Sequence, residues 1–182
     1  MNMSAWFGDL LFRIDEGNLR IRADQLRARL RFYPMMVGGQ ALLAPMFVAL
    51  LWGQAAHRNL LSWLAVMLAL HAVEMLVWWR YRRQTATIEE CHSWNRRFIL
   101  MTTAVGLCWG STALWFFPPD LAYQAMLICV MLGLAAGAVT MNPVYPPSLY
   151  IYVACVTLPL IFRVVSAGDA PHFILAGMLL LF

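Results

Sequence analysis

The sequence predicts an all-α integral membrane protein: a bundle of six transmembrane helices, the sixth truncated, preceded by an amphipathic N-terminal helical segment. Hydrophobic residues make up 62% of the 182 positions and charged residues only 12%, with a mean hydropathy of +0.67. Soluble domains average roughly 45–50% apolar and about 25% charged residues. A soluble chain of this length could not bury so much apolar surface. The composition therefore excludes an ordinary soluble enzyme, a disordered chain and a nucleic-acid-binding domain.

Six apolar segments supply the predicted helices. A helix needs about 20 apolar residues to cross the ~30 Å hydrocarbon layer. The segments that meet or approach this length cover residues 34–53, 60–79, 98–117, 121–140 and 147–165. A further segment begins at His172, and by Phe182 it rises only ~16 Å as a helix. We therefore expect the chain to continue beyond residue 182.

The arginines predict the orientation in the membrane. All thirteen basic residues are arginine. If the N-terminus is cytoplasmic, all of them except Arg58 and Arg163 lie on the cytoplasmic side, in line with the positive-inside rule. A sixth span then returns the C-terminus to the cytoplasm. The arginines to which we assign topology and lipid contact are Arg20, Arg22, Arg27, Arg29, Arg80, Arg82 and Arg83.

Residues 1–33 form the predicted cytoplasmic amphipathic segment, and residues 34–182 form the transmembrane domain. Early acidic residues and the lack of an early apolar run exclude a signal peptide. Two short helices, separated at Gly17-Asn18, each carry an apolar stripe, and arginines flank the second stripe. Such a helix lies in the lipid headgroup layer, or it packs against another domain or a second copy of the chain. Periodicity does not distinguish these alternatives.

An ionisable pair in the second predicted span is the most costly feature of the sequence. His71 and Glu74 are three residues apart, so they share one face of a helix. An ionisable side chain at the membrane centre costs at least ~2.5–3.5 kcal/mol on insertion scales. The functional interpretation is a polar ligand contact or a protonation-sensitive switch. The structural alternatives are an interhelical hydrogen bond, or a Glu74 side chain that extends toward Arg80.

Small residues, prolines and methionines mark further helix faces. The pairs Gly106 with Gly110, and Gly133 with Gly137, predict close helix packing within the bundle; the alternative is a dimer seam or a sliding face. Pro45 and Pro159 interrupt the first and fifth spans, and a proline kink can frame a cavity. Methionines in the spans either line an adaptable lipophilic pocket or fill core and lipid-facing positions; they are Met67, Met75, Met101, Met126 and Met131.

The sequence contains no complete catalytic motif. Its four histidines lie at different predicted depths, and Cys91-His92 is adjacent instead of spaced for chelation. We therefore assign no catalytic and no metal-ligating residue, and we expect no cofactor and no nucleic-acid partner. Residues 1–182 are expected to have no catalytic activity of their own.

Several motifs follow one another in a characteristic order. They are Leu107-Cys108-Trp109-Gly110, residues 115–120 (Trp-Phe-Phe-Pro-Pro-Asp), residues 133–138 (Gly-Leu-Ala-Ala-Gly-Ala), Tyr145-Pro146, Leu158-Pro159-Leu160, Arg163 and Gly168-Asp169. This order resembles the MASE-like N-terminal membrane sensor region of bacterial signalling proteins. That region precedes GGDEF diguanylate cyclase domains, sometimes with an EAL phosphodiesterase domain, and sensor histidine kinases, often hybrid ones. The resemblance covers residues 20–182 and departs from the family at His71 and Glu74.

The resemblance implies a sensory input module in the bacterial inner membrane. Its last helix would control a cytoplasmic output domain after residue 182, a diguanylate cyclase or alternatively the kinase of a two-component system. Because the outer loops are short, a lipophilic or membrane-borne signal must meet the helices themselves. The candidate ligand-binding or switch residues are His71, Glu74, Trp109, Pro159 and Arg163, and the expected partners are membrane lipids, a small lipophilic molecule and a second copy.

Two hypotheses from other functional classes remain open. A small transporter or channel would require charged or broken-helix sites at the midplane and an internal repeat. Only His71 and Glu74 fit this requirement. A membrane-embedded enzyme would require catalytic side chains clustered at one depth.

Overall fold

The computed structural model describes residues 19–82, 88–141, 146–167 and 177, and over these residues the chain contains helices and turns but no strand. The helices are α2 (Leu19–Leu50), α3 (His57–Tyr81), α4 (Ile88–Trp115), α5 (Leu121–Met141) and α6 (Pro146–Val165). All five are long and apolar enough to cross a membrane. The predicted all-helical architecture is thereby confirmed for this part of the chain, and the length and composition of its five helices suit a membrane protein.

The apolar stretches agree closely with the first five predicted spans. They are Leu30–Leu50, His57–Arg80, Arg96–Trp115, Leu121–Val139 and Pro147–Val165. Apart from Gly177, the sixth predicted span lies outside the described residues, and so does the first predicted amphipathic helix.

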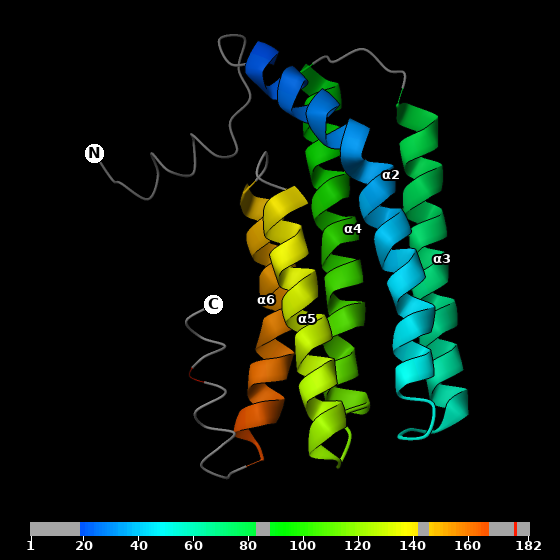
Figure 1. Ribbon diagram of the computed structural model, residues 1–182. Coiled ribbons are helices and arrows are strands. Elements are labelled where there is room, and N and C mark those ends of the chain that lie inside the picture. Colours follow the sequence, from blue (N-terminus) through cyan, green and yellow to red (C-terminus); the bar gives the residue numbers. More distant parts are fainter. Residues whose placement is uncertain (1–18, 83–87, 142–145, 168–176, 178–182) are drawn as a thin grey trace.

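Helix α2 is longer than the predicted first span. It continues without interruption from Leu19 to Leu50 and contains both Pro34 and Pro45. The second predicted amphipathic stretch is therefore the first part of the same helix. Proline removes an amide hydrogen and crowds the preceding turn, so it bends a helix that continues through it. In Figure 1, α2 curves and crosses the other helices obliquely.

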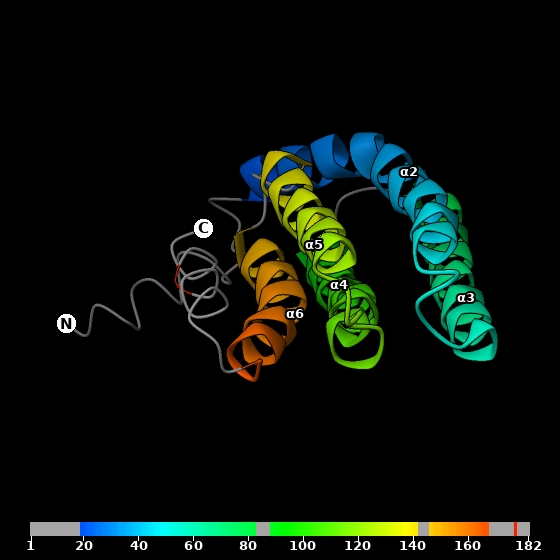
Figure 2. The same cartoon turned by 60° about the horizontal axis from the view of Figure 1, so that its bottom comes forward.

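The helices form two groups. Helices α2 and α3 make an antiparallel pair. Helix α4 packs mainly against α6, and α5 also packs against α6. Figures 1 and 2 show the α2–α3 pair beside the α4–α5–α6 group. The principal contact, between α4 and α6, joins helices that are separated by α5 in the sequence, whereas α4 and α5 touch only slightly.

Local chemistry fixes the turn between α4 and α5. Pro118 and Pro119 have no amide hydrogen and cannot continue the hydrogen-bond pattern of α4. Asp120 then caps α5, because its Oδ1 accepts hydrogen bonds from the backbone amides of Ala122 at 2.8 Å and Tyr123 at 3.4 Å. This short turn brings the end of α4 and the start of α5 to the same end of the bundle.

Two clusters of buried side chains hold the helices together. The larger includes the rings of Phe47, Trp63, Trp109 and Phe116, whose contacting centroids are 5.1 to 6.5 Å apart. The smaller lies at the other end of α2 and α3, around the rings of Tyr33, Trp94 and Phe98. Aromatic rings at these separations contribute beyond their buried area.

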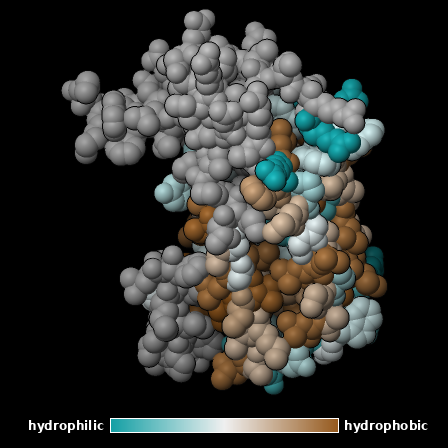
Figure 3. Space-filling view, turned by 45° about the horizontal axis from the view of Figure 1, so that its top comes forward, coloured by the Kyte–Doolittle hydropathy of each residue, from teal (hydrophilic) through white to brown (hydrophobic). Residues whose placement is uncertain are grey.

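Many large hydrophobic side chains lie on the outer surface of the helices. Only 28% to 39% of each span is buried within the chain, and leucine, methionine, valine and tryptophan dominate the exposed large side chains. Figure 3 shows hydrophobic side chains over much of this flank, with hydrophilic ones gathered toward one end. A flank of this composition is suited to lipid contact.

The arginines divide unequally between the two ends of the bundle. Because α3 and α4 run in opposite directions, Arg80, Arg82 and Arg96 lie at the same end, while Arg58 and Arg163 lie at the other. The Arg82 guanidinium lies 5.2 Å from the centre of the Trp78 ring. Of the remaining predicted topological arginines, four belong to the first turns of α2, and one lies outside the described residues: Arg20, Arg22, Arg27, Arg29 and Arg83.

Candidate functional site

Glu74 is the centre of a buried polar cluster between α2 and α3. The Nδ1 atom of His71 lies 2.9 Å from Glu74 Oε2, and the Tyr33 hydroxyl donates to Glu74 Oε1 at 2.9 Å. His71 is 3% exposed and Glu74 8% exposed. Each carboxyl oxygen therefore has a hydrogen-bond partner, which lowers the cost of burying the group.

The spacing of His71 and Glu74 places both on one face of α3, but nothing in the sequence indicated Tyr33 as their partner. Tyr33 lies just before the first predicted span, where a tyrosine is ordinary at a membrane interface. Its contact with Glu74 is an interhelical hydrogen bond between α2 and α3. The Nε2 atom of His71 is buried and has no hydrogen-bond partner among the described residues.

A second polar contact joins α2 to α4. Trp109 is fully buried, and its indole nitrogen donates to Gln40 Oε1 at 3.1 Å. Trp63 Nε1 donates to the backbone oxygen of Cys108 at 2.9 Å, so the two tryptophans are fixed by hydrogen bonds as well as by ring contact. Trp109 therefore orients the Gln40 side chain.

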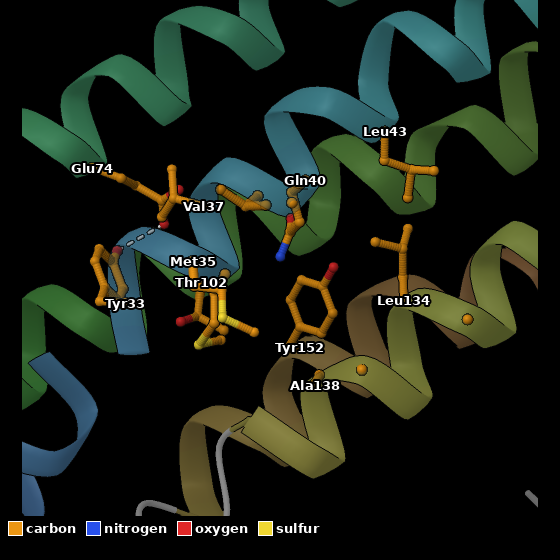
Figure 4. Close-up of a pocket in the computed structure, with 15 residues that line it drawn as sticks. Tyr33, Met35, Val37, Gln40, Leu43, Glu74, Thr102, Leu134, Ala138 and Tyr152 are labelled. Atoms are coloured by element: carbon orange, nitrogen blue, oxygen red, sulfur yellow. Dashed lines mark hydrogen bonds between the residues drawn. The ribbon is translucent and has the colours of Figure 1, made fainter. Parts of the chain in front are cut away.

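A cavity of about 350 Å³ lies between α2 and α5, and residues of α4 and α6 and Glu74 of α3 also line it (Figure 4). Its size falls within the range of roughly 300–1,000 Å³ that is usual for small-molecule sites. The residues that line it and are exposed are Met35, Gly39, Gly133 and Gly137. Among the described residues, the cavity is therefore open at the side, between α2 and α5.

Both polar contacts reach this cavity. Tyr33, Gln40 and Glu74 all line it, together with Tyr152 from α6. Tyr152 is 3% exposed, and its hydroxyl has no hydrogen-bond partner among the described residues. Figure 4 shows this hydroxyl pointing toward the Gln40 side chain. The cavity is thus mostly apolar, with a few converging polar groups, which is the usual character of a ligand site.

Only some of the predicted ligand-binding or switch residues lie at the cavity. Glu74 lines the cavity, and His71 and Trp109 reach it through their hydrogen bonds to Glu74 and Gln40. Pro159 and Arg163 do not line it. The Arg163 guanidinium lies 4.9 Å from the centre of the Phe117 ring, at the opposite end of the bundle.

The two glycine pairs have different surroundings. A Cβ atom at Gly106 would lie 2.9 Å from the Cys155 Cβ of α6, and a Cβ atom at Gly110 would overlap the Cys155 carbonyl oxygen. At Gly133 and Gly137, such an atom meets nothing within 4 Å among the described residues. Gly106 and Gly110 thus allow α4 and α6 to approach closely, whereas Gly133 and Gly137 widen the cavity.

The methionines at this cavity are not among the five for which a lipophilic pocket or a core or lipid-facing position was considered. Met35 and Met36 of α2 line it, and neither had been singled out. Met67 and Met131 are instead fully buried in the main core, and none of the five predicted methionines lines the cavity. Hydropathy alone could not separate these positions, because all of them lie in apolar helices.

Among residues 19–82, 88–141, 146–167 and 177, no group of three His, Cys, Asp or Glu side chains could hold a metal ion. The polar groups of the site instead suit hydrogen bonding to a small molecule. In comparisons with known proteins, no family model, no curated protein and no solved structure matches this chain.

Proposed function

We propose that the chain is the membrane sensory input module of a bacterial signalling protein, and that it detects a small lipophilic molecule which enters from the bilayer. The observation that carries this proposal is the sideways-opening cavity next to the buried Glu74 cluster. A molecule dissolved in the membrane can reach such an opening without crossing the headgroup layer.

The position of the cavity supports a switching role. Its walls come from α2 and Glu74 of α3 on one side, and from α4, α5 and α6 on the other. A ligand bound there contacts both helix groups, and it favours whichever relative position of the groups it fits better. A ligand shifts such an equilibrium only through its different affinities for the two states.

The sequence motifs support the nature of the output. They resemble regions found before diguanylate cyclase domains, so we propose a cyclase that produces cyclic di-GMP, with a histidine kinase as the alternative. In this proposal, either output enzyme, the cyclase or the kinase, acts as a pair of identical chains. The expected assembly is therefore a homodimer. The proposed location is the bacterial inner membrane, with the arginine-rich end in the cytoplasm.

Filling the cavity is expected to change the output of the complete protein. In Gly133→Phe, a ring would occupy space that is now open, because a Cβ atom at Gly133 has no described neighbour within 4 Å. The protein then resembles its ligand-bound state, and its output should differ severalfold from wild type. Cyclic di-GMP in cells that express the complete gene measures this effect; autophosphorylation replaces it for a kinase output.

Ala125→Phe provides the matched control. It adds the same ring to an exposed position of α5 that does not line the cavity, so its output should equal that of wild type. If Gly133→Phe is inserted at wild-type abundance and its output is unchanged, the cavity has no part in signalling.

A transporter or channel is the second candidate, and the buried Glu74 and His71 pair favours it. Purified protein in liposomes distinguishes the two functions, since a sensor module should conduct no ions or small solutes above the rate of empty liposomes. Measurable flux that Glu74→Gln abolishes would support transport instead.

Cysteine labelling tests the proposed orientation. In a background without the four native cysteines, Arg58→Cys should react with a membrane-impermeant maleimide in cells with a permeabilised outer membrane. Arg82→Cys should react only after lysis. These two positions are exposed and lie at opposite ends of α3, so both thiols are accessible to reagent in their own compartment. The reverse labelling pattern would place the arginine-rich end outside.

A further inference from the structure

The most informative polar group of the cavity is the hydroxyl of Tyr152. It is buried on α6, lines the cavity and has no hydrogen-bond partner among the described residues. A buried hydroxyl without a partner is destabilising and uncommon in native proteins. A bound molecule that supplies the missing partner would remove this penalty.

Gln40 supplies a second donor at the same place. Trp109 can only donate through its indole nitrogen, so the Gln40 atom that receives this bond must be the amide oxygen. The NH₂ group of Gln40 is thereby left facing the cavity, where Figure 4 shows it directed toward the Tyr152 hydroxyl. Two hydrogen-bond donors from different helices converge on one region of the cavity.

An oxygen that satisfies both donors accepts two hydrogen bonds and needs no hydrogen of its own. A carbonyl oxygen meets this description, because it accepts two hydrogen bonds near the plane of its substituents. The Glu74 carboxyl group also lines the cavity, so a carboxylate ligand would lose its hydration beside another carboxyl group. Each Glu74 oxygen already has one hydrogen-bond partner within the helices.

The remaining walls define the rest of the ligand. The α5 wall is apolar and consists of the small residues Gly133, Gly137 and Ala138 together with Leu134, and α2 adds Met35, Val37 and Leu43. An alkyl chain fits along such a wall. If each non-hydrogen atom takes ~30 Å³, the share of a water molecule in the liquid, the cavity holds about a dozen such atoms.

We propose that the cavity binds a neutral, chain-like carbonyl compound of about this size, such as a medium-chain ketone, ester or amide, whose carbonyl oxygen accepts hydrogen bonds from Tyr152 and Gln40. This inference deepens the proposed sensory function and rests on it. The ligand enters from the bilayer between α2 and α5, its carbonyl end reaches Tyr152, and its alkyl chain lies along α5.

Undecan-2-one is a suitable probe, with undecane and undecanoate as matched ligands that lack the carbonyl group or carry a negative charge. Each radiolabelled probe is equilibrated with the protein in phosphatidylcholine nanodiscs, and retention by empty nanodiscs is subtracted. We expect saturable binding of the ketone at least tenfold tighter than that of either matched ligand.

Tyr152→Phe removes the hydroxyl and keeps the ring, so it should weaken ketone binding about fivefold and leave undecane binding unchanged. Tyr150→Phe is the matched control, because Tyr150 lies on the same helix, is 70% exposed and does not line the cavity. The infrared carbonyl band of bound ¹³C-labelled ketone should lie at lower frequency than in lipid, and Tyr152→Phe should raise it.

Each outcome decides the proposal. Equal binding of ketone and undecane, tighter binding of undecanoate, absence of saturable binding, or an unchanged carbonyl band in Tyr152→Phe would overturn it. Failure of the sensory function has a different signature: the ketone binds with the expected dependence on Tyr152, but output does not change in Gly133→Phe. If Gly133→Phe changes output and the ketone does not bind, the sensory function stands and the ligand class is wrong.

Discussion

Gly110→Ala is expected to destabilise the folded bundle by about 3 kcal/mol, at the upper end of what overpacking usually costs. The added methyl group would overlap the backbone oxygen of Cys155 and lie 3.1 Å from the Pro159 Cγ. A backbone atom cannot rotate away, so α4 and α6 must separate along the main interface of the bundle. This cost exceeds the gain of about 1 kcal/mol that alanine brings to a helix.

Reversible unfolding in mixed detergent micelles measures this difference, and the other glycines act as controls. Gly133→Ala meets no described atom within 4 Å, so its stability should equal that of wild type or exceed it slightly. Gly106→Ala should also be destabilised, since its methyl group would contact the Cys155 side chain. Cys155→Gly should partly rescue Gly106→Ala but not Gly110→Ala. Equal stability of Gly110→Ala and wild type would refute the proposed close packing.

The sequence predicted the spans well because hydropathy is a local property. Five stretches of about 20 apolar residues could be read without knowing their neighbours, and the structure moves their ends by only a few residues. The start of α2 was less predictable. Proline discourages a helix locally, yet α2 continues through Pro34, where Tyr33 and Val37 pack against Trp94 and Phe98.

The contacts between helices could not be predicted in the same way. Gly106 with Gly110, and Gly133 with Gly137, have the same spacing, and only the position of α6 makes one pair a packing site and the other a cavity wall. The sequence gives no sign that α4 contacts α6 more than its neighbour α5. Such pairings depend on the whole bundle and not on any segment.

The sequence predicted some residues of the candidate site but not the others. His71 and Glu74 stand out, because ionisable side chains are costly in an apolar helix. Tyr33, Gln40 and Tyr152 do not stand out, since a single tyrosine or glutamine in a span is common enough to need no special explanation. Their importance comes from convergence: α2 and α6 bring them to the same cavity, beside Glu74 of α3.

Removing the carboxyl group of Glu74 is expected to cost about 3 kcal/mol of stability. Glu74→Met keeps a side chain of similar length, but it leaves the Tyr33 hydroxyl without its acceptor and His71 Nδ1 without its hydrogen-bond partner. Each buried polar group that loses its partner costs about 1–3 kcal/mol, partly offset because a carboxyl group is no longer buried. Glu74→Gln, which keeps an acceptor oxygen, should lose only about 1 kcal/mol in the same unfolding assay.

A triple variant separates stability from signalling. Tyr33→Phe, His71→Leu and Glu74→Met together replace the whole cluster by apolar groups of similar size, and such replacements are often neutral or stabilising. The triple variant should therefore recover most of the stability that Glu74→Met loses. Its output should nevertheless differ from wild type, because α2 and α3 no longer share the polar contact that borders the cavity. A stable triple variant with wild-type output would show that the cluster only joins two helices, because the proposed sensing would then not depend on these three polar groups.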